Sequence, residues 1–417
     1  MTSSPLQTIT TDCCIAGGGP AGMMLGFLLA RAGVNVLVLE KHADFLRDFR
    51  GDTLHPSTLE LLHELGLLDE LLKEPHQKVF QISGKFRNGF FPIADFRHLP
   101  TRCQFIAFMP QWDFLNFLAR QAKRYPGFHL KMESKVTDVI VENGRVAGLS
   151  AETPDGKLEV RARLVIGADG RGSRVRQQAG LPVIDLGAPI DVLWFRLSKR
   201  ADDPGQSFGY VGAGHFMVLL DREDYWQCGF VIPKGKFSEI REGGLPSFLA
   251  AVAGLAPFLE DRVDELTAWE SIHLLTVKVD RLQRWHRPGL LCIGDAAHAM
   301  SPVGGVGINL AIQDAVAAAN LLFKPLREGN VASRDLQRVQ ARREYPARLT
   351  QRIQIFLHHR FLSRLFEEQT APPAPWPVRL LSRFPVLQRI PARMIGIGFR
   401  AEHIRSPEER PSTDRNE

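Results

Sequence analysis

Three glycines near the start of the chain have the spacing of a nucleotide-binding turn. Gly17, Gly19 and Gly22 follow a short apolar run and open a helical pattern. Gly17 allows a sharp turn out of the strand, Gly19 leaves the backbone bare where a pyrophosphate would touch it, and Gly22 allows the helix to pack close to the sheet. The helix N-terminus adds unpaired N–H groups and a partial positive charge. The pattern therefore predicts a strand, a glycine turn and a helix that bind a dinucleotide.

A single carboxylate narrows the choice of nucleotide. Glu40 ends the β-branched run that follows the predicted helix, so it stands at the end of a second strand. A carboxylate there accepts hydrogen bonds from both hydroxyls of an adenosine ribose and repels a 2′-phosphate. FAD or NAD is therefore favoured over NADP in this pocket.

Two later stretches place polar residues where apolar strands end. Asp169 and Gly170 follow an apolar run over residues 162–168, and Gly294 and Asp295 follow another such run. In open α/β sheets, ligands bind at the carboxyl ends of the strands. We therefore expect Asp295 to face a ligand.

These three motifs together resemble those of the FAD-dependent aromatic hydroxylases, the single-component flavoprotein monooxygenases related to 4-hydroxybenzoate hydroxylase. The resemblance covers the chain to about residue 350. It implies an α/β fold, in which a Rossmann-like FAD-binding domain has three layers (ββα) with a parallel sheet. An inserted, mostly antiparallel β-sheet then forms the substrate domain, and a helical segment ends the chain.

The resemblance also implies an activity. NAD(P)H reduces the FAD, molecular oxygen forms a flavin C4a-hydroperoxide, and an electron-rich aromatic, polyketide-like or quinone-like ring is hydroxylated. The cofactor carries this chemistry, while the protein supplies orientation, a dry pocket and electrostatics. No catalytic residue is therefore assigned, and Arg50 and Pro302 are only candidates near the flavin.

Several residues are expected to hold the cofactor if the resemblance is right. Asp295, after Gly294, is placed to bind the ribitol hydroxyls of a flavin. Gly305 and Gly307 open a helix over residues 308–322, whose positive end would face the pyrimidine edge of the flavin. In the same motif, His298 is expected to be structural.

Other cofactor contacts rest on the resemblance alone. Gln111 begins a helix that starts near the FAD diphosphate and ribityl chain in this family, and Arg50 matches a cofactor-contacting arginine. Asp169 belongs to a stretch associated with both FAD and the nicotinamide cofactor. No second dinucleotide fold is visible in the sequence, so NAD(P)H is expected to dock in a surface groove, with NADH and NADPH both left open.

Two interpretations of the stretch after Asp169 remain open. In one, Asp169 faces the cofactors, and the side chains of Ser173, Arg174 and Arg176 reach phosphates. In the other, Asp169 only pins a turn and Arg174 is a surface residue.

The elements that position these motifs come from separated parts of the chain. The FAD-binding domain is expected over 1–75, 108–180 and 280–360, and the substrate domain over 76–107 and 181–279. Residues 361–417 form a C-terminal segment whose last dozen residues are expected to be disordered. Aromatic residues of the inserted sheet are candidates for the substrate pocket, with core packing as the alternative: Phe195, Tyr210 and Phe216.

Composition excludes several classes of protein. The 417 residues are 44% hydrophobic and 24% charged with a formal net charge of +6, as in a globular protein. No basic run with interleaved aromatics indicates nucleic acid, and no signal peptide or transmembrane segment is predicted. Five cysteines without metal-ligand spacing predict reduced thiols in a cytoplasmic protein with no bound metal: Cys13, Cys14, Cys103, Cys228 and Cys292. A monomer or homodimer is expected.

The C-terminal segment alternates apolar and basic residues over 379–397. A peripheral membrane contact is one interpretation. Packing against the body of the protein is favoured, because Pro385 and Pro391 would interrupt any long helix.

Rival functions remain open at this stage. An FAD-dependent reductase of an isoprenoid-like substrate fits the same motifs, and so does a non-catalytic FAD-binding redox regulator. A flavin-dependent halogenase is a weaker rival, because the stretch from Trp226 to Pro233 only partly matches the halogenase W-x-W-x-I-P pattern.

Overall fold

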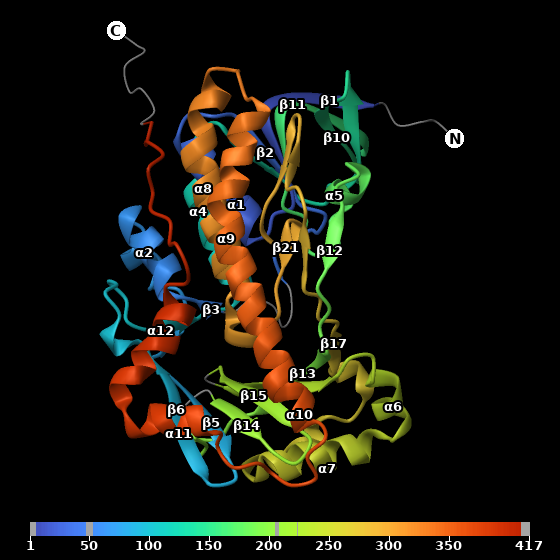
Figure 1. The fold of residues 1–417 in the computed structure, drawn as a ribbon. Coiled ribbons are helices and arrows are strands. Elements are labelled where there is room, and N and C mark those ends of the chain that lie inside the picture. Colours follow the sequence, from blue (N-terminus) through green and yellow to red (C-terminus); the bar gives the residue numbers. More distant parts are fainter. Residues whose placement is uncertain (1–5, 47–52, 205–207, 223, 410–417) are drawn as a thin grey trace.

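The computed structural model of the chain describes residues 6–46, 53–204, 208–222 and 224–409. A mainly parallel sheet lies at one end of the molecule and a mostly antiparallel sheet at the other (Figure 1). The long helix α9 (Ser333–Leu357) runs from the first sheet to the second. Arg50 lies outside the described residues.

The parallel sheet is built from apolar runs far apart in the sequence. Its order is β20-β11-β1-β2-β8, with every neighbouring pair parallel. The carboxyl halves of its central strands are buried, which explains why those runs are continuously apolar. The strands are β1 (Gln7–Ala16), β2 (Val36–Leu39), β8 (Phe128–Lys131), β11 (Gly156–Gly167) and β20 (Leu290–Cys292), with β19 (His286–Arg287) antiparallel at the edge.

Helices and a β-meander complete three layers around this sheet. α1 (Pro20–Arg31) packs against both α4 (Gln111–Ala122) and α8 (Gly307–Arg327), while β9 (Lys135–Glu142) and β10 (Arg145–Thr153) extend antiparallel from β11. The helices and the meander lie on opposite sides in Figure 1. This arrangement confirms the predicted ββα fold. The stretch Val303–Arg327, which contains α8, is long and apolar enough to cross a membrane, but 67% of its most apolar part is buried, as in a core helix.

The second sheet has seven strands in the order β17-β13-β16-β15-β14-β5-β6. All neighbours are antiparallel except β14 and β5. One face packs on α7 (Leu245–Leu255) and forms a second hydrophobic core. The strands are β5 (Gln81–Phe86), β6 (Gly89–Asp95), β13 (Ile190–Ser198), β14 (Phe208–Val211), β15 (Phe216–Asp221), β16 (Tyr225–Pro233) and β17 (His273–Leu275).

Short elements join the two ends of the molecule. The small sheets are β3 (Thr53–Leu54), β7 (Ile106–Phe108) and β4 (Gln77–Val79), and β12 (Val183–Asp185), β18 (Asp280–Leu282) and β21 (His298–Ala299). The remaining α-helices are α2 (Pro56–Glu64), α3 (Leu68–Leu71), α5 (Arg174–Gln178), α6 (Phe237–Glu242), α10 (Ser363–Leu365), α11 (Trp376–Arg383) and α12 (Arg389–Gly396). The 3-10 turns are η1 (Phe96–His98), η2 (Pro257–Leu259), η3 (Val263–Glu265), η4 (Trp269–Ser271), η5 (Gly294–Ala296), η6 (Val303–Gly305) and η8 (Pro385–Gln388), and η7 (His358–Leu362) is a π-helix.

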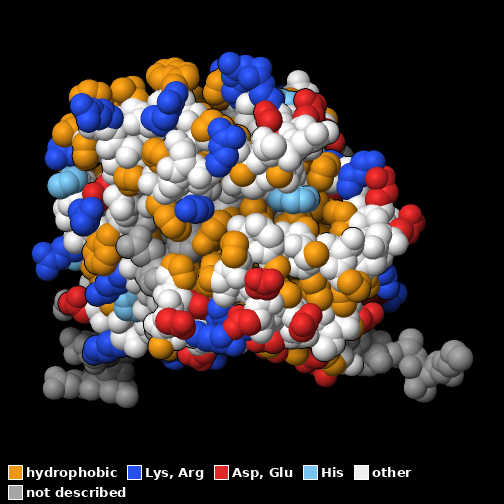
Figure 2. All heavy atoms as spheres, turned by 90° about the horizontal axis from the view of Figure 1, so that it is seen from below, with side chains coloured by type: hydrophobic (Ala, Val, Ile, Leu, Met, Phe, Trp, Pro, Cys, Tyr) orange, Lys and Arg blue, Asp and Glu red, His pale blue; other side chains and the backbone are white. Residues whose placement is uncertain are grey.

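The end of the chain returns to its beginning. α11 and α12 pack on β6, and the backbone N–H of Glu409 donates to the carbonyl oxygen of Arg31 in α1. Ser406 is buried, so residues 406–409 correct the expectation of disorder, while 410–417 lie outside the described residues. Leu380, Phe384 and Ile390 remain exposed, and a membrane contact stays a prediction. Figure 2 shows the molecule from below, where hydrophobic side chains lie intermixed with Lys and Arg side chains on the surface.

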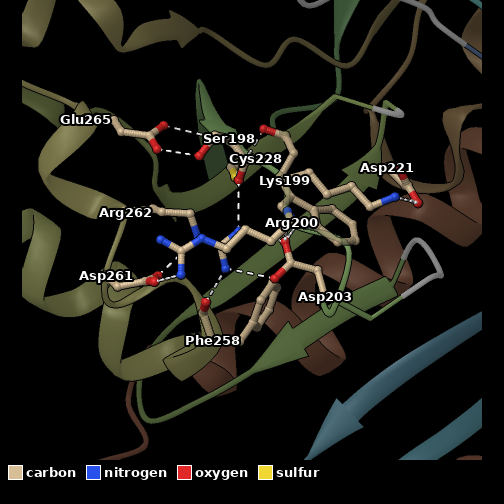
Figure 3. A network of polar contacts seen from close by, with 11 residues as sticks. Ser198, Lys199, Arg200, Asp203, Asp221, Cys228, Phe258, Asp261, Arg262 and Glu265 are labelled. Carbon is tan, nitrogen blue, oxygen red and sulfur yellow. Dashed lines mark hydrogen bonds and ion pairs between the residues drawn. The ribbon is translucent and has the colours of Figure 1, made fainter.

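A buried ion pair closes the outer side of the second core (Figure 3). The guanidinium of Arg262 donates two hydrogen bonds to Asp203, at 2.7 and 2.8 Å, and both side chains are 3% exposed. Burial alone would raise the pKa of Asp203, but the hydrogen bonds from Arg262 lower that pKa to about 2. The pair ties the segment after β13 to the turns that follow α7.

Candidate functional site

One large cavity lies between the two sheets. Its volume is 1990 Å³, and it extends from the glycine turn after β1 to the inner face of the seven-stranded sheet. A third wall comes from the end of α9, from α10 and from α11. A site that uses both sheets must therefore be in this cavity.

The glycine turn has the geometry that its sequence predicts. Gly17 has a φ of +104°, and a Cβ there would lie 2.4 Å from the carbonyl oxygen of Ala168. A Cβ on Gly22 would lie 2.0 Å from the carbonyl oxygen of Gly17, so α1 can start here only with glycine at that position. At Gly19 no described atom beyond the adjacent residues lies within 4 Å of where a Cβ would stand, so the turn is open to the cavity.

Glu40 holds the turn from the end of β2. Its carboxylate accepts hydrogen bonds from the backbone N–H groups of Gly18, at 2.8 Å, and His42, at 3.1 Å. The side chain is buried yet lines the cavity. A carboxylate at the end of the second strand is the group that a dinucleotide fold uses to bind ribose hydroxyls.

The cavity brings together most of the predicted cofactor residues. Gly22 and Gly294 do not line it and act through packing instead, as a Cβ on Gly294 would meet Ala311 and Ala21. Their contacts with a cofactor remain predictions. The predicted residues that line the cavity are Gly17, Gly19, Glu40, Gln111, Asp169, Asp295, Pro302, Gly305 and Gly307.

The stretch after β11 is held mainly by its own hydrogen bonds. Asp169 accepts from the hydroxyl of Ser173 and from the backbone N–H of Val175, and burial raises the pKa of this carboxyl group. Arg176 is buried in a bidentate pair with Asp280, at 3.0 and 3.1 Å. The expectation that Ser173 and Arg176 reach phosphates is therefore wrong, because both side chains are committed inside the protein.

Two arginines of the same stretch do line the cavity. Arg174 is exposed, and Arg171 lies 3.8 Å from the carboxylate of Asp295. Arg171 was not singled out in the sequence, where nothing distinguishes it from other loop charges. It places a positive charge beside the carboxylate predicted to bind the flavin ribitol.

A buried polar network supports the loop that carries Asp295. Asp314 of α8 accepts from the backbone N–H of Gly294 at 3.1 Å, lies 2.6 Å from His298 and accepts from Arg343 at 3.0 Å. Burial alone would raise the pKa of Asp314, but His298 and Arg343 hold that pKa below its ordinary value. Arg343 also donates to Glu402, at 3.3 Å. His298 is thus a structural residue, as expected.

The loop at Pro302 is held by α9. Gln354 donates to the carbonyl oxygens of Ser301 and Val303, and the hydroxyl of Ser301 lies 2.8 Å from Nε2 of His358. His358 opens the π-helix η7, a distortion that is frequent at functional sites. α9 therefore fixes the loop and, one turn later, contributes residues to the cavity wall.

The inner face of the seven-stranded sheet forms an apolar wall. Val192, Trp194, Val218 and Val231 line it from alternate positions of β13, β15 and β16. A Cβ on Gly229 would lie only 2.9 Å from the indole ring of Trp194, so the ring packs directly over this glycine. Rings of Phe86 and Phe216 cover two more strand glycines in the same way: Gly84 and Gly209. Because these three glycines have no side chain, aromatic rings of neighbouring residues can pack over the strands.

Only one of the three aromatic candidates for the pocket lies in it. Phe216 lines the cavity, whereas Phe195 and Tyr210 point to the opposite face and pack in the second core. Trp226, from the halogenase-like stretch, is also fully buried in that core. Successive strand residues face opposite sides, and both faces here are apolar, so the sequence did not reveal which was inner.

The residues present fit FAD. The turn at Gly19, the buried carboxylate of Glu40 and the half-buried carboxylate of Asp295 after β20 all line one cavity. Gly305 and Gly307, at the N-terminus of α8, line that cavity. The partial positive charge of this helix end therefore faces the cavity.

Comparisons with known proteins agree with this geometry. The sequence profile described as "FAD binding domain" matches residues 10–352. The chain is 33% identical over 405 residues to 6-methylpretetramide 4-monooxygenase of Streptomyces rimosus, covering 96% of each. It is 28% identical over 325 residues to 12-dehydrotetracycline 5-monooxygenase/anhydrotetracycline 6-monooxygenase of the same species, covering 73% of this chain and 61% of that relative.

Solved structures show the same fold. Pseudomonas aeruginosa PqsL in complex with 2-aminobenzoylacetate superposes with a TM-score of 0.74 at 21% identity, over 86% of this chain and 98% of that one. OxyS anhydrotetracycline hydroxylase from Streptomyces rimosus gives a TM-score of 0.70 at 24% identity, over 93% of this chain and 76% of that one.

Proposed function

This chain belongs to the FAD-dependent aromatic hydroxylases, and from that membership we propose that it hydroxylates a ring of a fused-ring aromatic polyketide. FAD is the cofactor, and NAD(P)H and O2 are the co-substrates. The relative that matches the chain along 96% of its length is a monooxygenase named for 6-methylpretetramide, which supports a substrate of this class.

The observation that carries the proposal is the cavity shared by both sheets. Its volume of 1990 Å³ exceeds the roughly 300–1,000 Å³ of an ordinary ligand pocket. A cavity of this size accommodates an isoalloxazine ring next to a second flat ring system. The apolar side chains of the inner sheet face suit a fused aromatic substrate better than a sugar or a peptide.

The protein's part in the reaction follows from the walls of the cavity. Bound FAD would supply the activation of O2 after reduction by NAD(P)H. The glycine turn and Glu40 hold the nucleotide end, and the N-terminus of α8 stabilises negative charge at the flavin. Val192, Val218 and Val231 exclude water from the space where the substrate ring reacts. Exclusion of water protects reactive intermediates from side reactions.

The rim of the cavity supports an acidic substrate. Arg360, Arg364 and Arg379 line it, are exposed, and form no ion pair with a residue that the structure describes. Trp376 and Phe356 stand beside them, 69% and 64% exposed. Polyketides of this class carry acidic enols, whose anions arginine side chains bind well.

The proposal is tested with the purified protein and isotopic oxygen. We expect bound FAD, bleaching on anaerobic addition of NADPH or NADH, and faster recovery in air with an aromatic polyketide or naphthol from a panel. The product should contain one atom from ¹⁸O2. Absence of FAD after reconstitution would contradict the cofactor assignment. A product that lacks ¹⁸O and gains two hydrogens would support the reductase instead.

A further inference from the structure

His55 is a buried histidine whose ring faces the cavity. It lies between β3 and α2, is 0% exposed, and lines the cavity beside Thr53. Its Nδ1 lies 2.7 Å from the backbone carbonyl oxygen of Ile395 in α12. A carbonyl oxygen only accepts, so Nδ1 carries the hydrogen and Nε2 is left as an acceptor.

Nε2 of His55 has no hydrogen-bond partner among the described residues. Neighbouring polar groups are committed elsewhere: the hydroxyl of Thr53 donates to the carbonyl oxygen of Gly305, and the amide of Asn309 bonds four other groups. Buried polar atoms without a partner are rare in proteins and call for an explanation. A ligand in the cavity would supply the missing donor.

The surroundings of Nε2 indicate the kind of ligand. His55 follows β3, which pairs with β7, and β7 pairs in turn with β4. Apolar side chains of these strands and of α12 line the cavity near Nε2: Val79, Ile106, Phe108 and Ile395. Burial lowers the pKa of His55 to about 4, so the ring is neutral near pH 7. Such a wall fits a flat apolar ring that carries one O–H donor.

We propose that Nε2 of His55 accepts a hydrogen bond from a ring hydroxyl of the aromatic substrate and thereby orients that ring in the cavity. This role rests on the proposed function, because it assumes a phenolic or enolic substrate. It also gives the C-terminal segment a part in the site: Ile395 lies beyond the matched residues 10–352 and determines which nitrogen of His55 accepts.

Two substitutions separate the two ring nitrogens. In His55→Asn the amide N–H can still reach the carbonyl oxygen of Ile395, but no acceptor replaces Nε2. In His55→Gln the longer side chain places an acceptor oxygen near the position of Nε2 and loses the donor at Nδ1. The probes are 2-naphthol, whose hydroxyl donates a hydrogen bond, and 2-methoxynaphthalene, in which a methyl group replaces the hydroxyl hydrogen. Their dissociation constants are measured by flavin absorbance on the oxidised, FAD-loaded protein without reductant.

We expect the wild-type protein and His55→Gln to bind 2-naphthol about tenfold more tightly than the ether, and His55→Asn to show no preference. Equal affinities in the wild-type protein would overturn the proposal, even if a variant fails to fold. A preference kept in His55→Asn would also overturn it. So would a tenfold weaker FAD affinity in His55→Asn with an unchanged probe ratio, because the donor would then be a flavin N–H.

The binding ratio is independent of turnover. Lack of a hydroxylated product contradicts the proposed function, and equal probe binding contradicts the role of His55. The two failures are therefore distinguishable.

Discussion

Removing the guanidinium of Arg343 should destabilise the protein strongly. In Arg343→Met the stem remains, but Asp314 loses a hydrogen bond of 3.0 Å and Glu402 loses one of 3.3 Å. Arg343 is 1% exposed and Asp314 0% exposed, so water cannot replace the lost partner. Removing one partner of a buried ion pair typically costs about 3–5 kcal/mol, and the contacts of Asp314 with Gly294 and His298, which remain, favour the lower end of this range. We expect a loss of that size in the free energy of unfolding.

The measurement is urea unfolding at pH 7, followed by circular dichroism and by flavin fluorescence on release of FAD. Arg348→Met is the matched control, because Arg348 lies on the same helix and forms an exposed pair with Glu344 at 3.4 Å. An exposed pair contributes about 0–1 kcal/mol. The reasoning is refuted if Arg343→Met and Arg348→Met unfold within about 1 kcal/mol of each other.

Two further predictions concern the cofactor and acid stability. Gly19→Val fills the open side of the turn, so we expect a folded protein whose absorbance spectrum shows no FAD. The control Gly254→Val, on α7, should keep FAD. Stoichiometric FAD in Gly19→Val would contradict the assignment of this turn to the pyrophosphate. The pKa of Asp203 is about 2 in the folded protein, below its ordinary value of 3.8, so the ionised side chain contributes stability above about pH 4, and this stability is lost at lower pH. Between about pH 5 and pH 3 the free energy of unfolding of the wild-type protein should fall by about 1 kcal/mol more than that of Asp203→Asn. Urea midpoints of the two proteins that change in parallel with pH would refute this.

Local motifs were predictable because their physics is local. The turn at Gly17 is dictated by a positive φ and by contacts within its own strand, turn and helix. Glu40 could be placed because it ends the strand next to that turn. The ββα fold followed from the family resemblance that the three motifs together carry.

The supporting residues could not be predicted, because their partners are distant in the sequence. Asp314 contacts Gly294 from a different element, and Arg343 joins it to Glu402 at the end of the chain. Each residue alone reads as an ordinary polar position on a helix or loop. Similarly, nothing in the sequence marks His55, whose meaning depends on the carbonyl oxygen of Ile395.

The seven-stranded sheet places the residues that line the cavity on one face and the residues that form the second core on the other. Odd and even positions along β13 face either the cavity or the core under α7, so Val192 and Trp194 line the cavity while Leu193 and Phe195 pack inside the second core. The lining of the cavity can therefore change at every second position while the positions between keep the second core intact. A lineage with this architecture can explore new ring systems by exchanging a handful of side chains, while the scaffold beneath them stays unchanged.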